Sequence, residues 1–182
     1  GNSHGDLCYC DHCRDRFQMW LKDKYHTIDE LNRAWGTAFW SQGYDDFTCI
    51  PAPKITAAWG VNPSHELDWK RFTSDLICEF HQFQADILRA VAPDKWITHN
   101  LMGFSSKPSY YDLGKQLDFA SHDQYPGGHF HARHDGYRAD WHAAELDMIR
   151  AVKQASFWVM EQQSGITGWD ILGRAPKPGQ IP

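Results

Sequence analysis

The sequence predicts an α/β protein with a parallel sheet, and two observations support this. First, residues 65–161 alternate between helical periodicity and short apolar runs, in the order helix, strand, short helix, strand, helix, strand. Second, the three expected strands are mostly apolar, as a parallel sheet covered on both faces requires. The pattern fits part of a (β/α)8 barrel or an open doubly wound sheet. Both architectures place a ligand site at the carboxyl ends of the strands.

Composition narrows the class of protein. The 182 residues correspond to roughly one domain, and no apolar run approaches the ~20 residues of a membrane span. With a net charge of −5, the chain lacks the excess of basic residues that is typical of nucleic-acid-binding proteins. Nine Trp, seven Tyr and ten Phe are an unusually large aromatic supply. They suit either a heavily aromatic core or apolar platforms on which sugar rings stack.

Two short helices are expected near the beginning of the chain. Residues 11–25 have apolar side chains at helical spacing. The stretch "TIDE" is a capping box, with Thr27 as N-cap and Glu30 three residues later, and Gly36 ends the helix that follows. Residues 36–64 form an irregular segment with too many aromatics for disorder: Phe39, Trp40, Tyr44, Phe47 and Trp59.

Residues 65–91 are the longest periodic segment and predict an amphipathic helix that covers a core. The expected apolar stripe consists of Phe72, Leu76, Phe80, Phe83, Ile87 and Val91. The remaining elements, in chain order, are a strand at 96–103, a helical turn at 110–117, a strand beginning at 118, a helix at 141–154 and a buried strand at 157–161.

Each expected strand ends in polar candidates: His99 and Asn100; His122, Asp123 and Tyr125; Glu161 and Gln162. Glu161 directly follows the uncharged run Phe157-Trp158-Val159-Met160. Glutamate has no special turn chemistry, so its place at a strand end favours a functional carboxylate over a solvated loop residue. Asn100 and Asp123 are weaker candidates.

Three segments together resemble the glycoside hydrolase family 42 β-galactosidases: "CYCDHCRDRFQMWLKDKYHTIDELNRAWGTAFWSQ", "DFASHDQYP" and "FWVMEQQSG". The resemblance covers nearly the whole chain. It implies a retaining β-galactosidase that hydrolyses terminal non-reducing β-D-galactose residues. It also implies a partial (β/α)8 TIM barrel, from just after strand 4 to just past strand 7. Residues 1–182 would form this partial catalytic domain, with residues 1–64 as a cysteine-containing, aromatic excursion after strand 4.

The resemblance also implies roles for individual residues. Glu161 in "MEQQ" is the expected nucleophile, Tyr125 a hydrogen-bond donor to it, and Trp40 and Trp169 line the galactose pocket. The acid/base Glu is expected just upstream of Gly1, because Gly1 matches the last residue of the family's "NE[YF]G" motif. We therefore expect the sequence to be a segment of a longer protein, and residues 1–182 alone to be inactive on lactose.

Cys8, Cys10 and Cys13 form a C-x-C-x-x-C cluster before the first helix. Three thiols this close suit a tetrahedral structural zinc, and reduced cysteines without metal are the alternative. The resemblance implies a fourth Cys ligand upstream, for which His4 or His12 could substitute. No catalytic cofactor is expected. Clustered, unpaired thiols suit a reducing compartment, so we expect a cytoplasmic protein.

Two other functions stay open from the residues alone. The loop "HFHARHDGYR" could hold a metal through His129 and His131, which would indicate a metal-dependent hydrolase, although no H-E-x-x-H motif accompanies it. A non-catalytic carbohydrate-binding or scaffold remnant is the third class. The expected partners are a β-galactoside oligosaccharide and further copies of the chain, with a trimer implied by the resemblance, and neither nucleic acid nor membrane.

Overall fold

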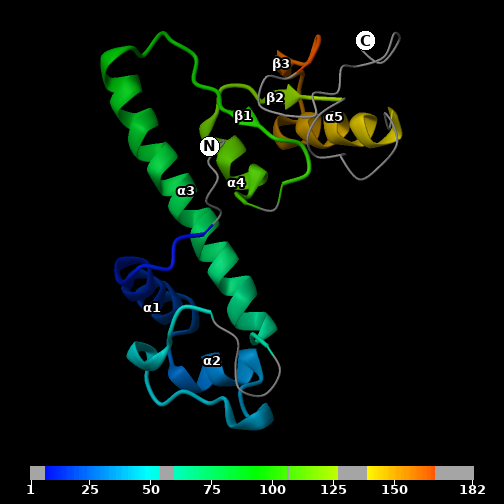
Figure 1. Ribbon diagram of the computed structural model, residues 1–182. Coiled ribbons are helices and arrows are strands. Elements are labelled where there is room, and N and C mark those ends of the chain that lie inside the picture. The colour runs from blue at the N-terminus through cyan, green and yellow to red at the C-terminus, as the bar shows by residue number, and fades with distance from the viewer. Residues whose placement is uncertain (1–6, 54–59, 106, 127–138, 167–182) are drawn as a thin grey trace. The chain divides into compact units, whose positions relative to one another are not determined.

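The computed structural model describes residues 7–53, 60–105, 107–126 and 139–166. The chain divides into two compact units, residues 1–79 and 80–182, and each is described by itself (Figure 1). Trp169, His129 and His131 lie outside the described residues. Among the helices of the described part, none is long and apolar enough to cross a membrane.

The first unit is built from α1 (Asp11–Tyr25), α2 (Ile28–Trp35) and the first half of α3 (Pro63–Val91), against which α1 and α2 lie in Figure 1. The predicted bounds of α1 are confirmed, and α3 begins two residues earlier than expected. The predicted cap of α2 is also confirmed, because Thr27 Oγ1 accepts from the Glu30 amide at 3.3 Å. Gly36 ends α2 in the left-handed region, at φ 64°.

The aromatic segment between α2 and α3 is part of the core of the first unit. It contains two short 3₁₀ turns, η1 (Phe39–Ser41) and η2 (Phe47–Cys49). Its buried side chains, Phe47 and Ile50, pack with Phe17 and Trp69 from the helices. The segment is held to α1 by Gln18, whose amide donates to two of its backbone carbonyls, at 3.0 and 2.8 Å.

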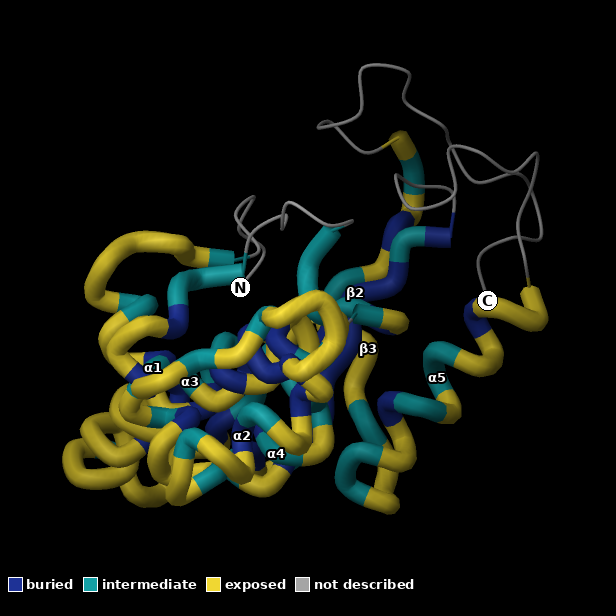
Figure 2. Tube along the Cα trace, turned by 90° about the horizontal axis from the view of Figure 1, so that it is seen from below, coloured by how far each residue is buried: buried dark blue, intermediate teal, exposed yellow. Residues whose placement is uncertain are grey.

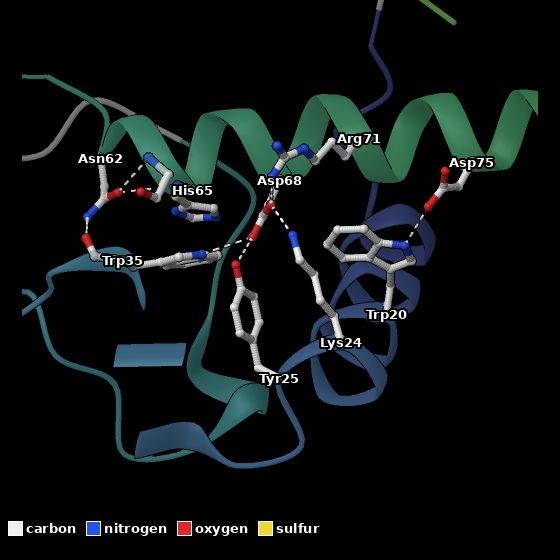
Figure 3. A network of polar contacts seen from close by, with 10 residues as sticks. Trp20, Lys24, Tyr25, Trp35, Asn62, His65, Asp68, Arg71 and Asp75 are labelled. Carbon is white, nitrogen blue, oxygen red and sulfur yellow. Dashed lines mark hydrogen bonds and ion pairs between the residues drawn. The ribbon is translucent and has the colours of Figure 1, made fainter. Parts of the chain in front are cut away.

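A buried carboxylate on α3 joins the three helices of the first unit. Asp68 is 1% exposed. It accepts from Lys24 Nζ at 2.5 Å, Tyr25 Oη at 2.6 Å and Trp35 Nε1 at 3.0 Å (Figure 3). Burial by itself would raise the pKa of Asp68, but these donors outweigh burial and hold the pKa below its usual range. The ionised carboxylate is therefore a structural centre of this unit.

The second unit contains a three-stranded parallel sheet with strand order β1-β2-β3, as the sequence predicts. The strands are β1 (Asn100–Leu101), β2 (Ser121–Gln124) and β3 (Trp158–Gln162). Helix α4 (Tyr110–Gln116) connects the first two strands and α5 (Ala139–Lys153) connects the last two. Gly114 allows the close packing of α4 on α5, because a Cβ there would lie 2.4 Å from Val152 Cγ1.

The second half of the apolar stripe predicted for α3 is wrong. Four of its members are between 51% and 74% exposed: Phe80, Phe83, Ile87 and Val91. His81 and Ala85 are buried instead, and His81 Nδ1 lies 2.8 Å from Gln116 Oε1 at the end of α4. The helical period was correct, but packing on α4 turned a different face of α3 inward.

The prediction of a buried third strand is also wrong for the described structure. Every residue of β2 is buried, whereas Trp158, Val159 and Met160 of β3 are exposed (Figure 2). The two strands differ in burial because β2 has a strand on each side, whereas β3 lies at an edge of the described sheet. An apolar run shows that a strand can be buried, and the neighbouring elements decide whether it is.

Candidate active site

Polar side chains gather on one face of the sheet in the second unit. Asn100 pairs with Ser121, and Asp123 pairs with Glu161 on the next strand. Side chains two residues apart share a face, so Tyr125 belongs to the same face as Asp123. Asn100, Asp123, Tyr125 and Glu161 therefore lie together at the carboxyl ends of three neighbouring parallel strands.

A bulge in the ladder brings Glu161 to this position. Val159 pairs with His122, but the next residue of β2, Asp123, pairs with Glu161 rather than with Met160. Met160 is thus the extra residue of the bulge. Without the bulge, Met160 would pair with Asp123. Glu161 would then pair with Gln124, one position further along β2.

Two donors converge on Glu161, one from β1 and one from the residue just past the end of β2. Asn100 Nδ2 donates to Oε1 at 3.1 Å, and the Tyr125 hydroxyl donates to Oε2. Burial, together with donation to the charged Glu161, raises the pKa of Tyr125 to about 12, so its phenol stays protonated at neutral pH. Hydrogen bonds to both oxygens hold the carboxylate in one orientation. The structure thus brings together two of the predicted site residues, Glu161 and Tyr125.

Asp123 is a less expected member of this face. Its side chain is buried, and burial, followed by the negative charge of Glu161, raises its pKa to about 6. Sequence reasoning named Asn100 and Asp123 only as weak candidates, on their places at strand ends. The stronger signal is spatial, since both flank Glu161 from neighbouring strands.

His122, a polar residue of β2 that the sequence also offered as a candidate, points away from this site. His122 lies between Ser121 and Asp123 on β2, so its side chain occupies the opposite face of the sheet. There its Nδ1 lies 3.1 Å from the carbonyl oxygen of Leu101, and burial lowers its pKa. His122 is therefore a neutral, buried histidine of the sheet, outside the group around Glu161.

Trp40, predicted to line a sugar pocket, belongs to the first unit. Its side chain is 56% exposed and its ring lies 4.5 Å from that of Phe39. Its backbone has φ 55°, and that of Ser41 has φ 52°. Two successive non-glycine residues in the left-handed region are strained, and such strain is common at functional sites. The exposed indole is available to a ligand.

The three clustered cysteines meet at the start of α1. Their sulfur atoms all lie within 4.8 Å of one another, and those of Cys8 and Cys10 are 3.4 Å apart. A tetrahedral zinc–thiolate site places its sulfurs about 3.8 Å apart, so the donor set fits zinc. Donation from the Cys13 backbone lowers the pKa of Cys10, whereas burial raises that of Cys13 to about 12. The three thiols are free of disulfides.

Comparison with known proteins finds relatives along almost the whole chain. A model of glycoside hydrolase family 42, β-galactosidase, matches residues 2–182. The β-galactosidase BgaA of a Thermus species is 44% identical over 193 residues, which cover 98% of this chain and 29% of that protein. The β-galactosidase of Thermus thermophilus is 42% identical and covers 96% of this chain and 28% of that protein. The chain thus spans less than a third of the length of these relatives.

Solved structures agree with the sequence matches. The β-galactosidase of the Antarctic haloarchaeon Halorubrum lacusprofundi superimposes with a TM-score of 0.88 at 38% identity, covering 100% of this chain and 28% of that one. The β-galactosidase of Bacillus circulans gives a TM-score of 0.83 at 34% identity, with 98% and 26% covered. With a family model over nearly every residue and the same fold in solved members, the chain belongs to the glycoside hydrolase family 42 β-galactosidases.

Proposed function

We propose that this chain supplies the nucleophile, Glu161, of a retaining β-galactosidase that acts on terminal non-reducing β-D-galactose residues. One observation carries the proposal: donors from two other strand ends, Asn100 and Tyr125, hold Glu161 at the carboxyl end of a parallel strand. Family membership and the names of the relatives support the substrate class. We further propose that β1, β2 and β3 are strands 5, 6 and 7 of a (β/α)8 barrel, whose active site occupies this end.

The contacts of Glu161 suit nucleophilic attack. One carboxylate oxygen forms a bond to the anomeric carbon while the bond from that carbon to the leaving oxygen breaks, which gives a covalent galactosyl-enzyme. Water then hydrolyses the ester and releases galactose with retained configuration. Asn100 and Tyr125 hold the carboxylate in its attacking orientation.

A retaining enzyme also needs a second carboxyl group, about 5–5.5 Å from the nucleophile, that protonates the leaving oxygen. We retain the prediction that this is a Glu of a segment preceding Gly1. On this proposal residues 1–182 alone have no efficient lactose hydrolysis, since general acid catalysis contributes ~10²–10⁴-fold. We also propose Trp40 and Trp169 as sugar platforms, and the exposure of Trp40 supports that role.

Trapping of the covalent intermediate tests the nucleophile. The full-length protein is incubated with an activated 2-deoxy-2-fluoro-β-galactoside, whose fluorine slows hydrolysis of the ester, and then digested. We expect mass spectrometry to find the fluorosugar on the peptide that contains Glu161, at about one label per chain. A label on another carboxylate would refute the assignment of Glu161.

We also propose a structural zinc held by Cys8, Cys10 and Cys13. Cys10→Ser in the full-length protein is expected to reduce bound zinc from about one ion per chain to near zero. The variant should also lose about 4 kcal/mol of stability when free zinc exceeds its dissociation constant ~1,000-fold in the wild type. Metal analysis and thermal unfolding measure the two effects.

Cys49→Ser is the matched control, because Cys49 is exposed and outside the cluster. It should leave both the zinc content and the melting temperature unchanged. Zinc-free wild-type protein with the same melting temperature as Cys10→Ser would contradict the metal proposal.

A further inference from the structure

Asp123 and Glu161 are two carboxyl groups on paired positions of neighbouring strands. Asp123 is 5% exposed, and both of its carboxyl oxygens are inaccessible to solvent. Within the described residues, neither oxygen accepts a hydrogen bond of good geometry, although the Asn100 amide, which donates to Glu161, lies close enough to lower the pKa of Asp123 slightly. A buried ionised carboxylate without donors is costly, and a like charge beside it adds to that cost.

The donors on this face distinguish the two carboxyl groups. Asn100 and Tyr125 both donate to Glu161. When two neighbouring carboxyl groups share one negative charge, the charge resides on the group that receives the hydrogen bonds. Here that group is Glu161, which leaves the proton on Asp123.

The groups around Asp123 also favour a proton on Asp123 and a negative charge on Glu161. Burial is the largest cause of the raised pKa of Asp123, the charge of Glu161 is the second, and the Asn100 amide opposes both. The titratable groups that face Asp123 from other positions are the phenols of Tyr125, just past β2, and Tyr110 on α4. Both have raised pKa values and are neutral at neutral pH. No cation among the described residues contributes to the pKa shift of Asp123.

We propose that Asp123 is a positioning residue that stays protonated while Glu161 is ionised, so that the pair carries one negative charge and Glu161 bears it. This inference rests on the proposed role of Glu161 as nucleophile. Ionised Asp123 would repel Glu161 and compete for the Asn100 amide, which would move the carboxylate from its line of attack. Because its oxygens are inaccessible, Asp123 is not the group that protonates the leaving oxygen.

Stability against pH gives a readout that does not depend on activity. The pKa of Asp123 is raised in the folded state from 3.8 to about 6, so its stabilising contribution is complete below pH 3.8 and is lost as pH rises through 6. Asp123→Asn mimics the protonated form at every pH. In the full-length protein, its folding equilibrium constant relative to wild type should therefore increase by roughly 100-fold between pH 4 and pH 8.

Asp118→Asn is the matched control, because Asp118 lies three residues before the start of β2. The Asp118 carboxylate accepts from the Ile97 amide at 2.6 Å and from Arg89 at 2.8 Å, and donation from the Ile97 amide holds its pKa low. The sign is opposite, because the ionised form stabilises the fold. Asp118→Asn should lose stability relative to wild type as pH rises toward 3.8, and the difference should stay nearly constant between pH 4 and pH 8. It should leave the pH profile of turnover unchanged.

Kinetics then separates positioning from a merely structural role. In wild type, kcat/KM should decline as pH rises through about 6, and Asp123→Asn should abolish this decline at a cost of about tenfold or less at pH 5. In a Glu161→Gln background, the stability change caused by Asp123→Asn should shift toward lower pH, because the neighbouring charge is gone.

The outcomes distinguish this inference from the proposed function. The role of Asp123 is overturned if the stability difference between Asp123→Asn and wild type is the same at pH 4 and pH 8, or if Asp123→Asn leaves the pH profile of kcat/KM unchanged. In either case, fluorosugar labelling of Glu161 would still support the nucleophile. A label on another residue refutes the proposed function, and the stability titration still reports the proton on Asp123.

Discussion

Glu161→Gln in the full-length protein should lower kcat on a β-galactoside by about four orders of magnitude or more, with the fold intact. The amide keeps the shape of the side chain but is not a nucleophile. Its single carbonyl oxygen can accept one of the two hydrogen bonds that Asn100 and Tyr125 donate to Glu161, and the Tyr125 hydroxyl can instead accept from the new amide nitrogen. Steady-state kinetics measures the loss, and thermal unfolding verifies the fold. Binding of galactose should persist, since a change confined to the reacting group affects kcat more than ground-state binding.

Azide rescue makes the assignment sharper. Glu161→Ala opens space beneath the anomeric carbon, so azide should restore part of the activity on an activated aryl β-galactoside and give the inverted α-galactosyl azide. Glu66→Gln is the matched control, because Glu66 is an exposed residue of α3 paired with Lys70 at 2.8 Å, and its turnover should equal wild type. Near-wild-type turnover by Glu161→Gln, or a β-galactosyl azide product, would contradict the nucleophile role.

Asp68→Ala should destabilise the first unit by about 3–5 kcal/mol. The substitution leaves the Tyr25 hydroxyl and the Trp35 indole N–H without their acceptor, and Lys24 without its counter-charge (Figure 3). Unfolding in urea, followed by tryptophan fluorescence, measures the effect, because Trp35 and Trp69 are both buried in this unit.

Asp75→Asn is the control for Asp68. Asp75 lies two turns further along α3, is exposed, and accepts from Trp20 Nε1 at 2.8 Å. Exposed hydrogen bonds and ion pairs contribute little, so the loss of stability should stay below about 1 kcal/mol. Equal effects of Asp68→Ala and Asp75→Asn would show that the buried network does not hold the three helices together.

Features whose physical cause lies within a few residues were predictable from sequence. Thr27 caps the amide of Glu30, three residues away, and Gly36 adopts the left-handed conformation that ends the same helix. Cys8, Cys10 and Cys13 converge because they share one short segment at a helix start. In each case the interacting groups are neighbours in the chain, so their meeting requires no knowledge of the rest of the fold.

Features that depend on distant segments were not predictable. The apolar spacing of α3 indicated a stripe through Phe80 and Phe83, yet His81 is buried because Gln116, 35 residues later, packs against it. The run Trp158-Val159-Met160 is apolar but exposed, since β3 has a described neighbour on one side alone. Local pattern sets the period of an element, and packing decides which face is covered.

The same distinction between local and distant causes applies to the candidate site. The sequence by itself determined that Glu161 follows an apolar strand, that other strands end in Asn100, Asp123 and Tyr125, and that the motif around Glu161 resembles a nucleophile. Only the tertiary structure decided that Asn100, 61 residues earlier, donates to Glu161, and that a bulge at Met160 aligns Glu161 with Asp123. The reason is strand register: a shift of one residue turns every following side chain to the opposite face, and pairing between distant strands sets it.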